Sequence, residues 1–493
     1  MTTPAFNQPQ PAGPPPPAAR PTRALAWGAF GVAGVLSLGL VGGGAIFALN
    51  RVDARGPQPE TALPSSAIAF AKIDLDPSVG QKIDALRFLR KFPAAQDALS
   101  GIDEKDDLRQ RVFQTLQEEG EFEGVDYARD VEPWLGQRVG MAVLPGVEGG
   151  EPQVVVALAS TDEEAARRGL SRVTEDGGYC SVQPDFAVCG QGQAVVDKAV
   201  NDTAKGALAD DTNFTRDLAD LGEDGIATAW VDGAKVADWD PGQVGATSGS
   251  VQGRYAVALR FDGPTLELAG RASDLPPGSA PVGQGTSVGD LPATTLAAFA
   301  VTGLDESIRR AWPQIDQSAR DTLGQDWQQG LDAFTAETGM SVPDDVAAAL
   351  GSDTAVAVGP NAQEPEVALV TNGDRSLIDT VVGSVNESSG SSGSPLLIVK
   401  DAGERTVVTT HAGYGDEIAN GSGLGATSTF KDAVPGADQA SAVGYVDIAK
   451  TLETFGEDVD DEEMANLAPL SALGLAVRGE EDHAEFTLRL TTR

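Results

Sequence analysis

A duplicated module constrains this sequence more than any other feature. GVDYARDVEPWLG (124–136) aligns without a gap with GMSVPDDVAAALG (339–351), and the same shift of 215 residues carries WVDGAK (230–235) onto YVDIAK (445–450). Three further pairs of blocks follow in the same order: 63–74 with 291–303, 151–158 with 364–370, and 254–271 with 473–490. Two copies are too few for a solenoid, so we expect two related globular halves.

Composition divides the rest of the chain around these copies. Pro, Gly and Ser are frequent between the copies, and Pro is frequent in the N-terminal residues, which is typical of linkers and tails. The expected division is a disordered Pro-rich tail (1–23), a transmembrane helix (24–49), a juxtamembrane linker (50–62), repeat 1 (63–274), a Gly/Pro/Ser linker (275–290) and repeat 2 (291–493).

Short strand-like runs alternate with helical patterns inside each copy. Arg138–Leu144 and Gln153–Ala159 predict a β-hairpin, and 254–271 predicts another. Thr161–Asp176 predicts a helix, with Thr161 and Glu164 as a capping box. Hairpins imply antiparallel pairing, so we expect an α+β fold with mainly antiparallel sheet packed with helices.

The segment ALAWGAFGVAGVLSLGLVGGGAIFAL (24–49) contains no charged residue. As a helix it would be about 39 Å long, enough to cross a hydrocarbon core of about 30 Å. We interpret it as an uncleaved signal-anchor, with cleavage near Ala48 as the alternative. Gly39 and Gly43 form a GxxxG motif that would allow a weak homodimer through this helix.

The charges that flank this segment do not decide its orientation. Arg20 and Arg23 precede it, while Arg51 and Arg55 follow it, so the positive-inside count is nearly a tie. The cysteines must therefore indicate which side of the membrane the repeats occupy.

The two cysteines of the chain both lie in YCSVQPDFAVCG (179–190). A hairpin about Pro184–Asp185 places Cys180 opposite Cys189 at a non-hydrogen-bonded site, where the Cα atoms approach to about 4.5 Å. This predicts a disulfide, which places the repeats in an oxidising, extracytoplasmic space and the N-terminus in the cytoplasm. Two buried free thiols are the alternative. A metal site is not expected, because two thiols with only His411 and His483 elsewhere do not make a tetrahedral set.

These features together resemble a known group of sequences. A Pro-rich tail, one apolar span, the opening LPSSAIAF, the WLG turn before a hairpin and the duplicated unit resemble an uncharacterised family of single-pass membrane-anchored actinobacterial proteins, catalogued as a domain of unknown function. The resemblance implies no activity, ligand, cofactor or catalytic residue.

Two motifs suggest chemistry at first sight. GTSVG (285–289) matches the nucleophile elbow GxSxG, but Ser287 lies in the expected linker without the strand and helix that such a turn needs. His411 and His483 would be the candidate bases, and we interpret both as surface or strand-end residues. The acidic run GEDVDDEE (456–463) could bind Ca²⁺, but we expect a solvated helix start.

Both copies also share VDxAK, in which we expect Asp232 and Asp447 to cap a helix that follows a strand. The net charge of −38 argues against nucleic acid as a partner. We therefore expect a membrane-anchored, non-enzymatic binding or structural module of the cell envelope, without a cofactor and with an envelope protein as its partner. The alternatives are an extracytoplasmic hydrolase with carboxylates that the sequence does not place, and a carrier of an apolar ligand.

Overall fold

The computed structural model describes most of the chain beyond residue 55. The described residues are 56–75, 78–99, 108–118, 122, 124–146, 150–173, 178–222, 225–237, 252–276, 280, 283, 285–364, 366–389, 395–421, 423–480 and 482–493. The expected tail, the apolar segment and its Gly39–Gly43 motif lie outside these ranges. Within the described ranges, no helix is both long and apolar enough to cross a bilayer.

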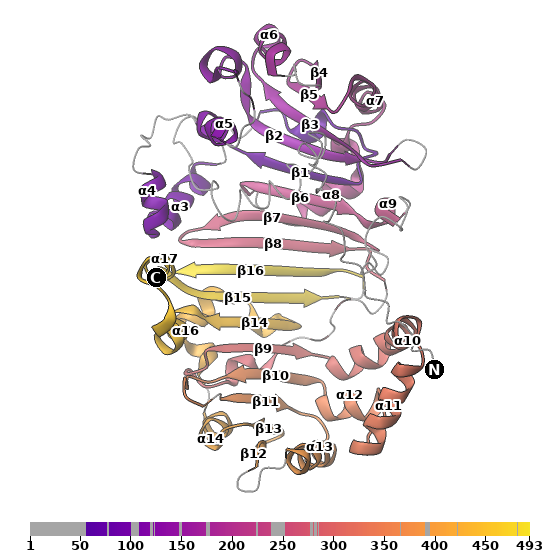
Figure 1. The fold of residues 1–493 in the computed structure, drawn as a ribbon, viewed down its shortest axis with the longest axis vertical. Helices are drawn as coiled ribbons and strands as arrows, with labels where there is room; N and C mark the ends of the chain where they lie inside the picture. The colour runs from indigo at the N-terminus through magenta and orange to yellow at the C-terminus, as the bar shows by residue number, and fades with distance from the viewer. Residues whose placement is uncertain are drawn as a thin grey trace, which may run out of the picture.

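The described strands form one antiparallel sheet of sixteen strands, and helices accompany it (Figure 1). This confirms the expected α+β class with a large antiparallel sheet. The strands of the first repeat are β1 (Ala69–Asp74), β2 (Leu135–Leu144), β3 (Gln153–Ser160), β4 (Tyr179–Val182), β5 (Phe186–Gly190), β6 (Ala227–Asp232), β7 (Arg254–Asp262) and β8 (Thr265–Ser273). Those of the second are β9 (Ala297–Thr302), β10 (Asp353–Val358), β11 (Val367–Thr371), β12 (Ile398–Ala402), β13 (Arg405–Thr409), β14 (Ala442–Asp447), β15 (Leu470–Gly479) and β16 (Ala484–Thr492).

The strand order repeats itself. The first repeat contributes β8-β7-β6-β1-β2-β3-β5-β4, and the second contributes β16-β15-β14-β9-β10-β11-β13-β12. Adding eight to each strand number of the first order gives the second order, so both repeats have one topology. The halves meet where β8 pairs with β16, and β4 and β12 lie at the two far ends of the sheet.

Pairing registers identify the equivalent residues of the two copies. Ala227 of β6 pairs with Leu259 of β7, and its counterpart Ala442 of β14 pairs with Val477 of β15. Equivalent residues of the two copies are therefore 215 positions apart in β6 and β14 (442 − 227) but 218 positions apart in β7 and β15 (477 − 259). The alignment of 254–271 with 473–490 was therefore wrong by one residue. A slip of one residue exchanges the two faces of a strand, and the observed register keeps inward positions inward.

The junction between the repeats has approximate twofold symmetry. Ala269 of β8 lies opposite Thr487 of β16, and 487 − 269 is again 218. The same position of both copies therefore meets at the centre of the junction. This self-complementary arrangement is the one found at the interface of a symmetric dimer.

One face of the sheet, the covered face, carries two equivalent apolar cores. In the first repeat Phe70 and Trp230 pack against α7, η6 and α8, and in the second Val443 and Tyr445 pack against η7, α14, η8 and α15. Val288 of η7 is fully buried in the second core, so the expected linker becomes packed structure before it ends. The bounds of these covering helices are α7 (Gln193–Thr203), η6 (Leu208–Asp210), α8 (Thr212–Ala219), η7 (Ser287–Asp290), α14 (Ala412–Asn420), η8 (Leu424–Ala426) and α15 (Ser428–Ala433).

The remaining helices precede or connect the strands in the sequence, and three of them, α3, α6 and α13, pack on the other face of the sheet. In the first repeat they are η3 (Pro59–Thr61), α3 (Val79–Leu89), α4 (Pro93–Leu99), α5 (Leu108–Glu118), the π-helix η4 (Tyr127–Val131), α6 (Glu163–Val173) and α9 (Gly233–Ala237). In the second they are α10 (Leu304–Leu323), α11 (Gln325–Thr338), α12 (Asp344–Leu350), α13 (Arg375–Ser388), η9 (Ala437–Gln439), α16 (Ile448–Phe455), η10 (Gly456–Asp458) and α17 (Asp461–Leu467).

The expected capping box before α6 is wrong, although the helix is present. The N-cap is Asp162, whose Oδ1 accepts from the backbone N–H of Ala165 at 2.8 Å. Thr161 instead donates its hydroxyl to the backbone oxygen of Trp134, which fixes the end of the preceding turn. Aspartate and threonine are both good N-caps, so the sequence alone does not choose between neighbours.

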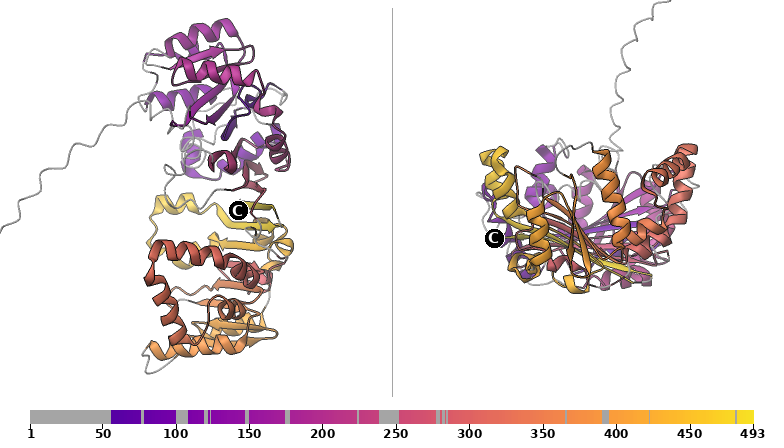
Figure 2. Two further views of the ribbon diagram at one scale, coloured as in Figure 1. Left: turned by 90° about the vertical axis from the view of Figure 1, so that its right-hand side faces the viewer. Right: turned by 90° about the horizontal axis from the view of Figure 1, so that it is seen from below.

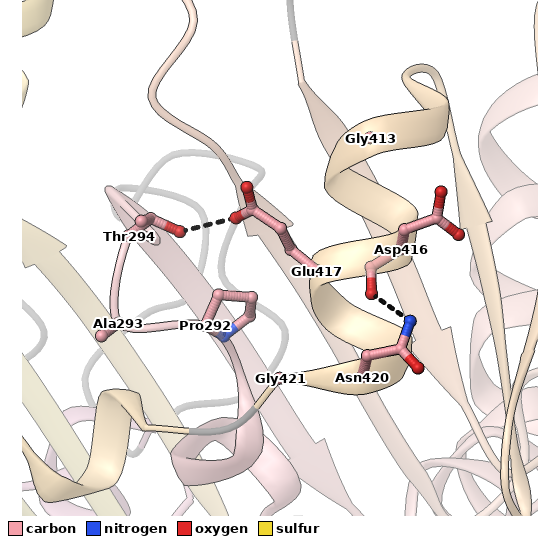
Figure 3. A pocket seen from close by; sticks show the side chains of 8 residues that line it. All are labelled: Pro292, Ala293, Thr294, Gly413, Asp416, Glu417, Asn420 and Gly421. Atoms are coloured by element: carbon pink, nitrogen blue, oxygen red, sulfur yellow. Dashed lines mark hydrogen bonds between the residues drawn. The ribbon is translucent and has the colours of Figure 1, made fainter.

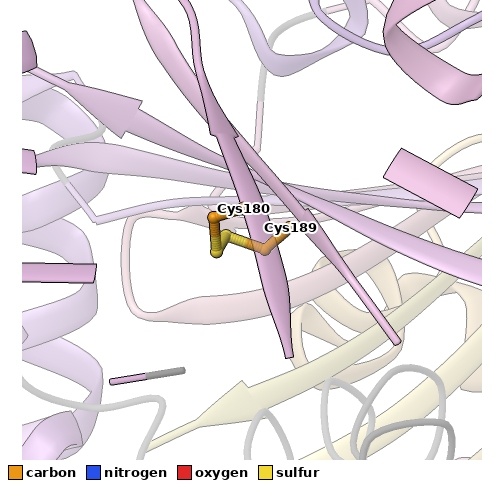
Figure 4. The surroundings of a disulfide bond; sticks show 2 residues. All are labelled: Cys180 and Cys189. Atoms are coloured by element: carbon orange, nitrogen blue, oxygen red, sulfur yellow. A yellow bond between two sulfur atoms is a disulfide. The ribbon is translucent and has the colours of Figure 1, made fainter. Parts of the chain in front are cut away.

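The cysteine hairpin has the expected register. Cys180 pairs with Cys189, the Cα atoms are 4.1 Å apart, and the sulfur atoms form a disulfide (Figure 4). At the equivalent place of the second repeat, Val399 pairs with Val408. A pair of apolar β-branched side chains therefore occupies the site that the disulfide fills in the first repeat.

Candidate functional site

The open face of the sheet, opposite the two cores, is the most unusual surface of the molecule. We define it by Phe299 of β9 and its direct neighbour Val356 of β10, whose side chains point away from the core. Phe299 is 52% exposed and Val356 is 42% exposed. Tyr255 and Val367 are also exposed on this face.

A row of directly opposed residues crosses the open face. Opposed residues of antiparallel strands point to the same side, so this row forms one strip. Its members are Val399, Val408, Leu369, Val356, Phe299, Gly444, Leu475, Leu488, Leu268, Leu259 and Ala227. The strip carries no polar side chain across eleven strands.

Helices cover the strip in some places. Ile378 and Val382 of α13 pack against Val408, together with Leu369 and Val399. Ala85 and Phe88 of α3 pack in a cluster that includes Leu259 and Ala227. The central strands between these two clusters carry the exposed Phe299 and Val356.

Acidic and amphipathic helices flank the ends of these strands. The end-on view of Figure 2 shows helices on both sides of the sheet, and Figure 1 places α11 and α17 at opposite strand ends. Helix α11 carries Asp326, Asp332 and Glu337 and no Lys or Arg. Helix α17 begins with Asp461, Glu462 and Glu463. Helices α11 and α17 are therefore acidic, whereas α10, which follows β9, carries three arginines beside four acids.

A small depression lies at a different place, beside α14 (Figure 3). It has a volume of about 460 Å³ and is lined by residues 292–294 and by α14. Its two carboxylates already have partners, because Glu417 accepts from Thr294 Oγ1 at 3.0 Å and Asp416 pairs with Lys400. The depression therefore lacks a free acid–base pair.

The residues behind this depression are arranged for packing. Tyr414 is buried, its hydroxyl lies 3.2 Å from Thr295 Oγ1, and burial raises the pKa of Tyr414 to about 12. The phenol thus stays protonated at neutral pH. His411 precedes α14 and places Nδ1 3.2 Å from Glu366 Oε1.

Six carboxylates are buried in the described part of the chain, and each has a basic partner. The pairs are Glu60 with Lys72 at 3.0 Å, Asp130 with Arg129 at 2.6 Å, Asp217 with Arg254 at 2.7 Å, Asp232 with Lys235 at 3.6 Å, Glu267 with Arg489 at 2.6 Å, and Asp447 with Lys450 at 2.7 Å. Among the described residues, no three His, Cys, Asp or Glu side chains are placed to hold a metal ion.

The family model described as "Protein of unknown function (DUF3352)" matches residues 30–183 and 175–387. The chain belongs to the DUF3352 family. A match in two segments fits the duplicated topology. No curated protein and no solved structure matches the chain. Membership in DUF3352 therefore assigns the chain to a family but does not indicate an activity.

The structure separates the residues that the sequence suggested as catalysts. Ser287 begins η7, and its buried hydroxyl has no hydrogen-bond partner within the described ranges. His411 contacts Glu366, and His483 lies in the turn between β15 and β16 beside Asp482. The carboxylate of Asp353 accepts from the backbone N–H of Ser287 at 3.3 Å, and within the described ranges neither histidine forms a hydrogen bond with the Ser287 hydroxyl.

The two VDxAK motifs are capping motifs, as expected. Asp232 Oδ1 accepts from the backbone N–H groups of Ala234 and Lys235, and Asp447 Oδ1 accepts from that of Lys450. The lysines extend the likeness, because Lys235 donates to the backbone oxygen of Ser65 and Lys450 donates to that of Ala293. Each motif thus ties a helix start to the opening loop of its own repeat.

The acidic run 456–463 also forms a helix start. Asp460 is the N-cap of α17 and accepts from the backbone N–H groups of Glu462 and Glu463. Acidic side chains in a first helical turn are stabilised by the helix dipole. The acidic run is therefore the start of a helix, as expected.

Sequence reasoning missed the open face. The signal was present in strands such as AAFAVT (297–302), where small and large apolar residues alternate instead of apolar and polar ones. Strands that are apolar on both faces are typical of sheets that are covered on both faces. An antiparallel sheet with such strands and too few helices to cover it must expose an apolar surface.

Proposed function

We propose that this DUF3352 protein is a membrane-tethered binding protein of the cell envelope and that the open face is its binding surface. The observation that carries the proposal is the half-exposed Phe299–Val356 pair in the middle of an uninterrupted apolar strip. Soluble proteins rarely leave large contiguous apolar patches uncovered unless they bind something there.

The extracytoplasmic location rests on two separate features. Residues 24–49 lack charge and are long enough for a membrane span, and the folded repeats follow them. The disulfide between Cys180 and Cys189 supports an oxidising compartment for those repeats. In this arrangement the open face points into the envelope space.

The charge pairs of the interior support a binding role over hydrolysis. A glycosidase or protease that uses two carboxylates needs one of them protonated or free to act as a base. Here each buried carboxylate described above is engaged by Lys or Arg, and the shallow depression beside α14 holds its acids in contacts of their own.

The apolar character of the open face also favours a second candidate, a carrier of an apolar ligand. Such a ligand would lie along the strip that contains Phe299 and Leu475. Both candidates use the same surface, and a direct test of that surface distinguishes them.

The test places a photo-reactive benzophenone amino acid at position 299 of the full chain in its native cells. Irradiation followed by mass spectrometry should give one discrete adduct, a protein for the binding role or a lipid for the carrier role. The same amino acid at Leu396, which is 50% exposed but outside the strip, is the control. Equal labelling from both positions, or no adduct from position 299, would refute a binding role for the open face.

The location is tested separately. Protease added to cells whose outer envelope is permeabilised but whose cytoplasmic membrane is intact should degrade the repeats. A thiol-alkylating reagent added before lysis should leave Cys180 and Cys189 unmodified. Protection of the repeats from protease, or alkylation of both thiols, would place them in the cytoplasm and contradict the proposal.

A further inference from the structure

We infer that the uncovered centre of the open face receives an amphipathic helix from a partner protein, with Lys or Arg on its polar side. This inference rests on the proposed binding function and names the class of partner. Parts of the same face are already covered by the protein's own helices.

Each covered part of the open face described here is covered by a helix. Helix α13 places Ile378 and Val382 on Val408, and α3 places Phe88 on Phe261 with 5.5 Å between the ring centroids. At the end of the first repeat, α6 places Leu170 in a cluster with Cys189. Three different helices thus use one mode of packing on the same surface, which shows what shape fits it.

The uncovered centre has room for another helix. Phe299 lies on β9, with β10 on one side and β14, β15, β16 and β8 on the other. Leu266 of β8 and Leu490 of β16 already belong to the cluster that α3 covers, so the free floor consists of β10, β9, β14 and β15. Four strands at about 4.8 Å spacing span about 14 Å, and a helix with its side chains is about 10–12 Å across, so one helix would cover Phe299 and Val356.

Charge selects the polar side of that helix. The whole chain carries a net charge of −38, α11 has three acids and no base, and α17 starts with three acids. A helix whose polar face carries Lys or Arg would be attracted to these flanks, and an acidic one would be repelled. The same charge disfavours a second copy of this chain as the occupant.

The recognition mode is therefore a helix laid with its apolar side on an apolar floor, with residues at i, i+3, i+4 and i+7 as anchors. Phe299 would be the central contact, because it is the most exposed large side chain of the strip. The partner supplies the helix and its basic residues.

The experiment uses the full chain in nanodiscs of neutral lipid and two fluorescent 18-residue peptides. One peptide is an amphipathic Leu/Lys helix, and the other has Glu in place of each Lys; empty nanodiscs give the blank. Binding of the Leu/Lys peptide should exceed that of the Leu/Glu peptide and weaken as salt rises. Phe299→Arg should reduce binding about tenfold or more, because it removes the central anchor and adds a like charge. Leu396→Arg is the matched control and should leave binding unchanged.

The outcomes separate this inference from the proposed function. Equal binding of both peptides, or no effect of Phe299→Arg, would overturn the helix inference. A lipid adduct from position 299 in cells would also overturn it while leaving a binding function in place. A concentration-dependent dimer that Phe299→Arg disrupts would identify a second copy as the occupant and overturn the inference as well. Absence of both peptide binding and any adduct would refute the function and the inference together.

Discussion

Arg489 of β16 donates to Glu267 of β8 across the junction of the two repeats, with 2.6 Å between Nη1 and Oε2. Arg271 of β8 is the counterpart of Arg489, and Glu485 of β16 is the counterpart of Glu267. Arg271 donates to Glu485 across the same junction, also at 2.6 Å. One pair of positions is therefore used twice, on either side of the axis near Ala269.

These twin ion pairs predict unequal effects of one substitution at equivalent positions. The Glu267 side chain is 7% exposed and also binds Arg260, so Glu267→Gln should cost about 2 kcal/mol because it removes the carboxylate that two partly buried guanidinium groups share, although Arg489 keeps its ion pair with Asp262. Glu485 is 47% exposed, and Glu485→Gln should cost less than about 1 kcal/mol. Urea denaturation of the purified chain measures both values. Equal losses would show that the symmetry of the contacts outweighs their burial.

The disulfide can be replaced by a pair of valines, as in the second repeat, where Val399 pairs with Val408. Replacing Cys180 and Cys189 together with valine should cost about 2–3 kcal/mol of loop-closure stabilisation, offset in part by the added apolar contact. Replacing both with serine should cost more, because hydroxyl groups would enter the cluster around Trp134. Thermal unfolding without reductant ranks the two double variants. A serine pair as stable as the valine pair would mean that this cluster is accessible to water.

The exposure of the open face predicts that a substitution at Phe299 costs little stability, whereas one at Tyr445 on the neighbouring strand costs much more. Phe299→Thr should cost only about 1 kcal/mol, because the ring is already half exposed. Tyr445→Thr on neighbouring β14 should cost about 3–5 kcal/mol, because this ring is buried against Phe430 at 5.1 Å between centroids. Chemical denaturation compares them. A large loss from Phe299→Thr would mean that part of the chain covers this residue.

Asp130 predicts a pH-dependent contribution to stability. A hydrogen bond from Arg129, together with the backbone N–H of Asp126 and the side chain of Arg172, lowers the pKa of Asp130 well below its ordinary value. A lowered folded-state pKa stabilises the fold above the unfolded value of about 3.9, and this contribution is lost as pH falls below that value.

Asp130→Asn should therefore destabilise the protein by about 2–3 kcal/mol at pH 7, and the difference from the parent should shrink as the pH falls below about 4. Denaturation curves over this pH range provide the measurement. Asp345→Asn, at the equivalent position of the second repeat, removes an acceptor for Ser341 without an ion pair and should have the smaller effect. A difference in stability that does not change with pH would show that the charge of Asp130 does not contribute to stability.

The sequence predicted those parts of the fold that depend on local patterns. The Cys180–Cys189 hairpin follows from a two-residue turn and period-2 counting, and the VDxAK caps follow from the preference of aspartate for helix starts. The capping of α6 was wrong because Thr161 and Asp162 satisfy the same local rule, and the choice depends on the distant Trp134.

The open face required information that no local pattern contains. Whether Phe299 is buried depends on whether α10 and α11 fold over β9, and both helices follow β9 in the sequence as the α3 helix follows β1. In the first repeat Phe88 of α3 packs against the sheet, whereas α10 buries none of its residues. This divergence between two copies of one module is tertiary, and it creates the candidate site.

The pairing of β8 with β16 also has a consequence for solubility. A free strand edge is a template on which foreign chains can assemble into aggregates, and joining the two copies removes the longest such edge from each. What remains exposed are β4 and β12, of four and five residues, and the latter carries Lys400 and Asp401. Fusion of the two copies thus gives a very wide sheet little capacity for uncontrolled growth.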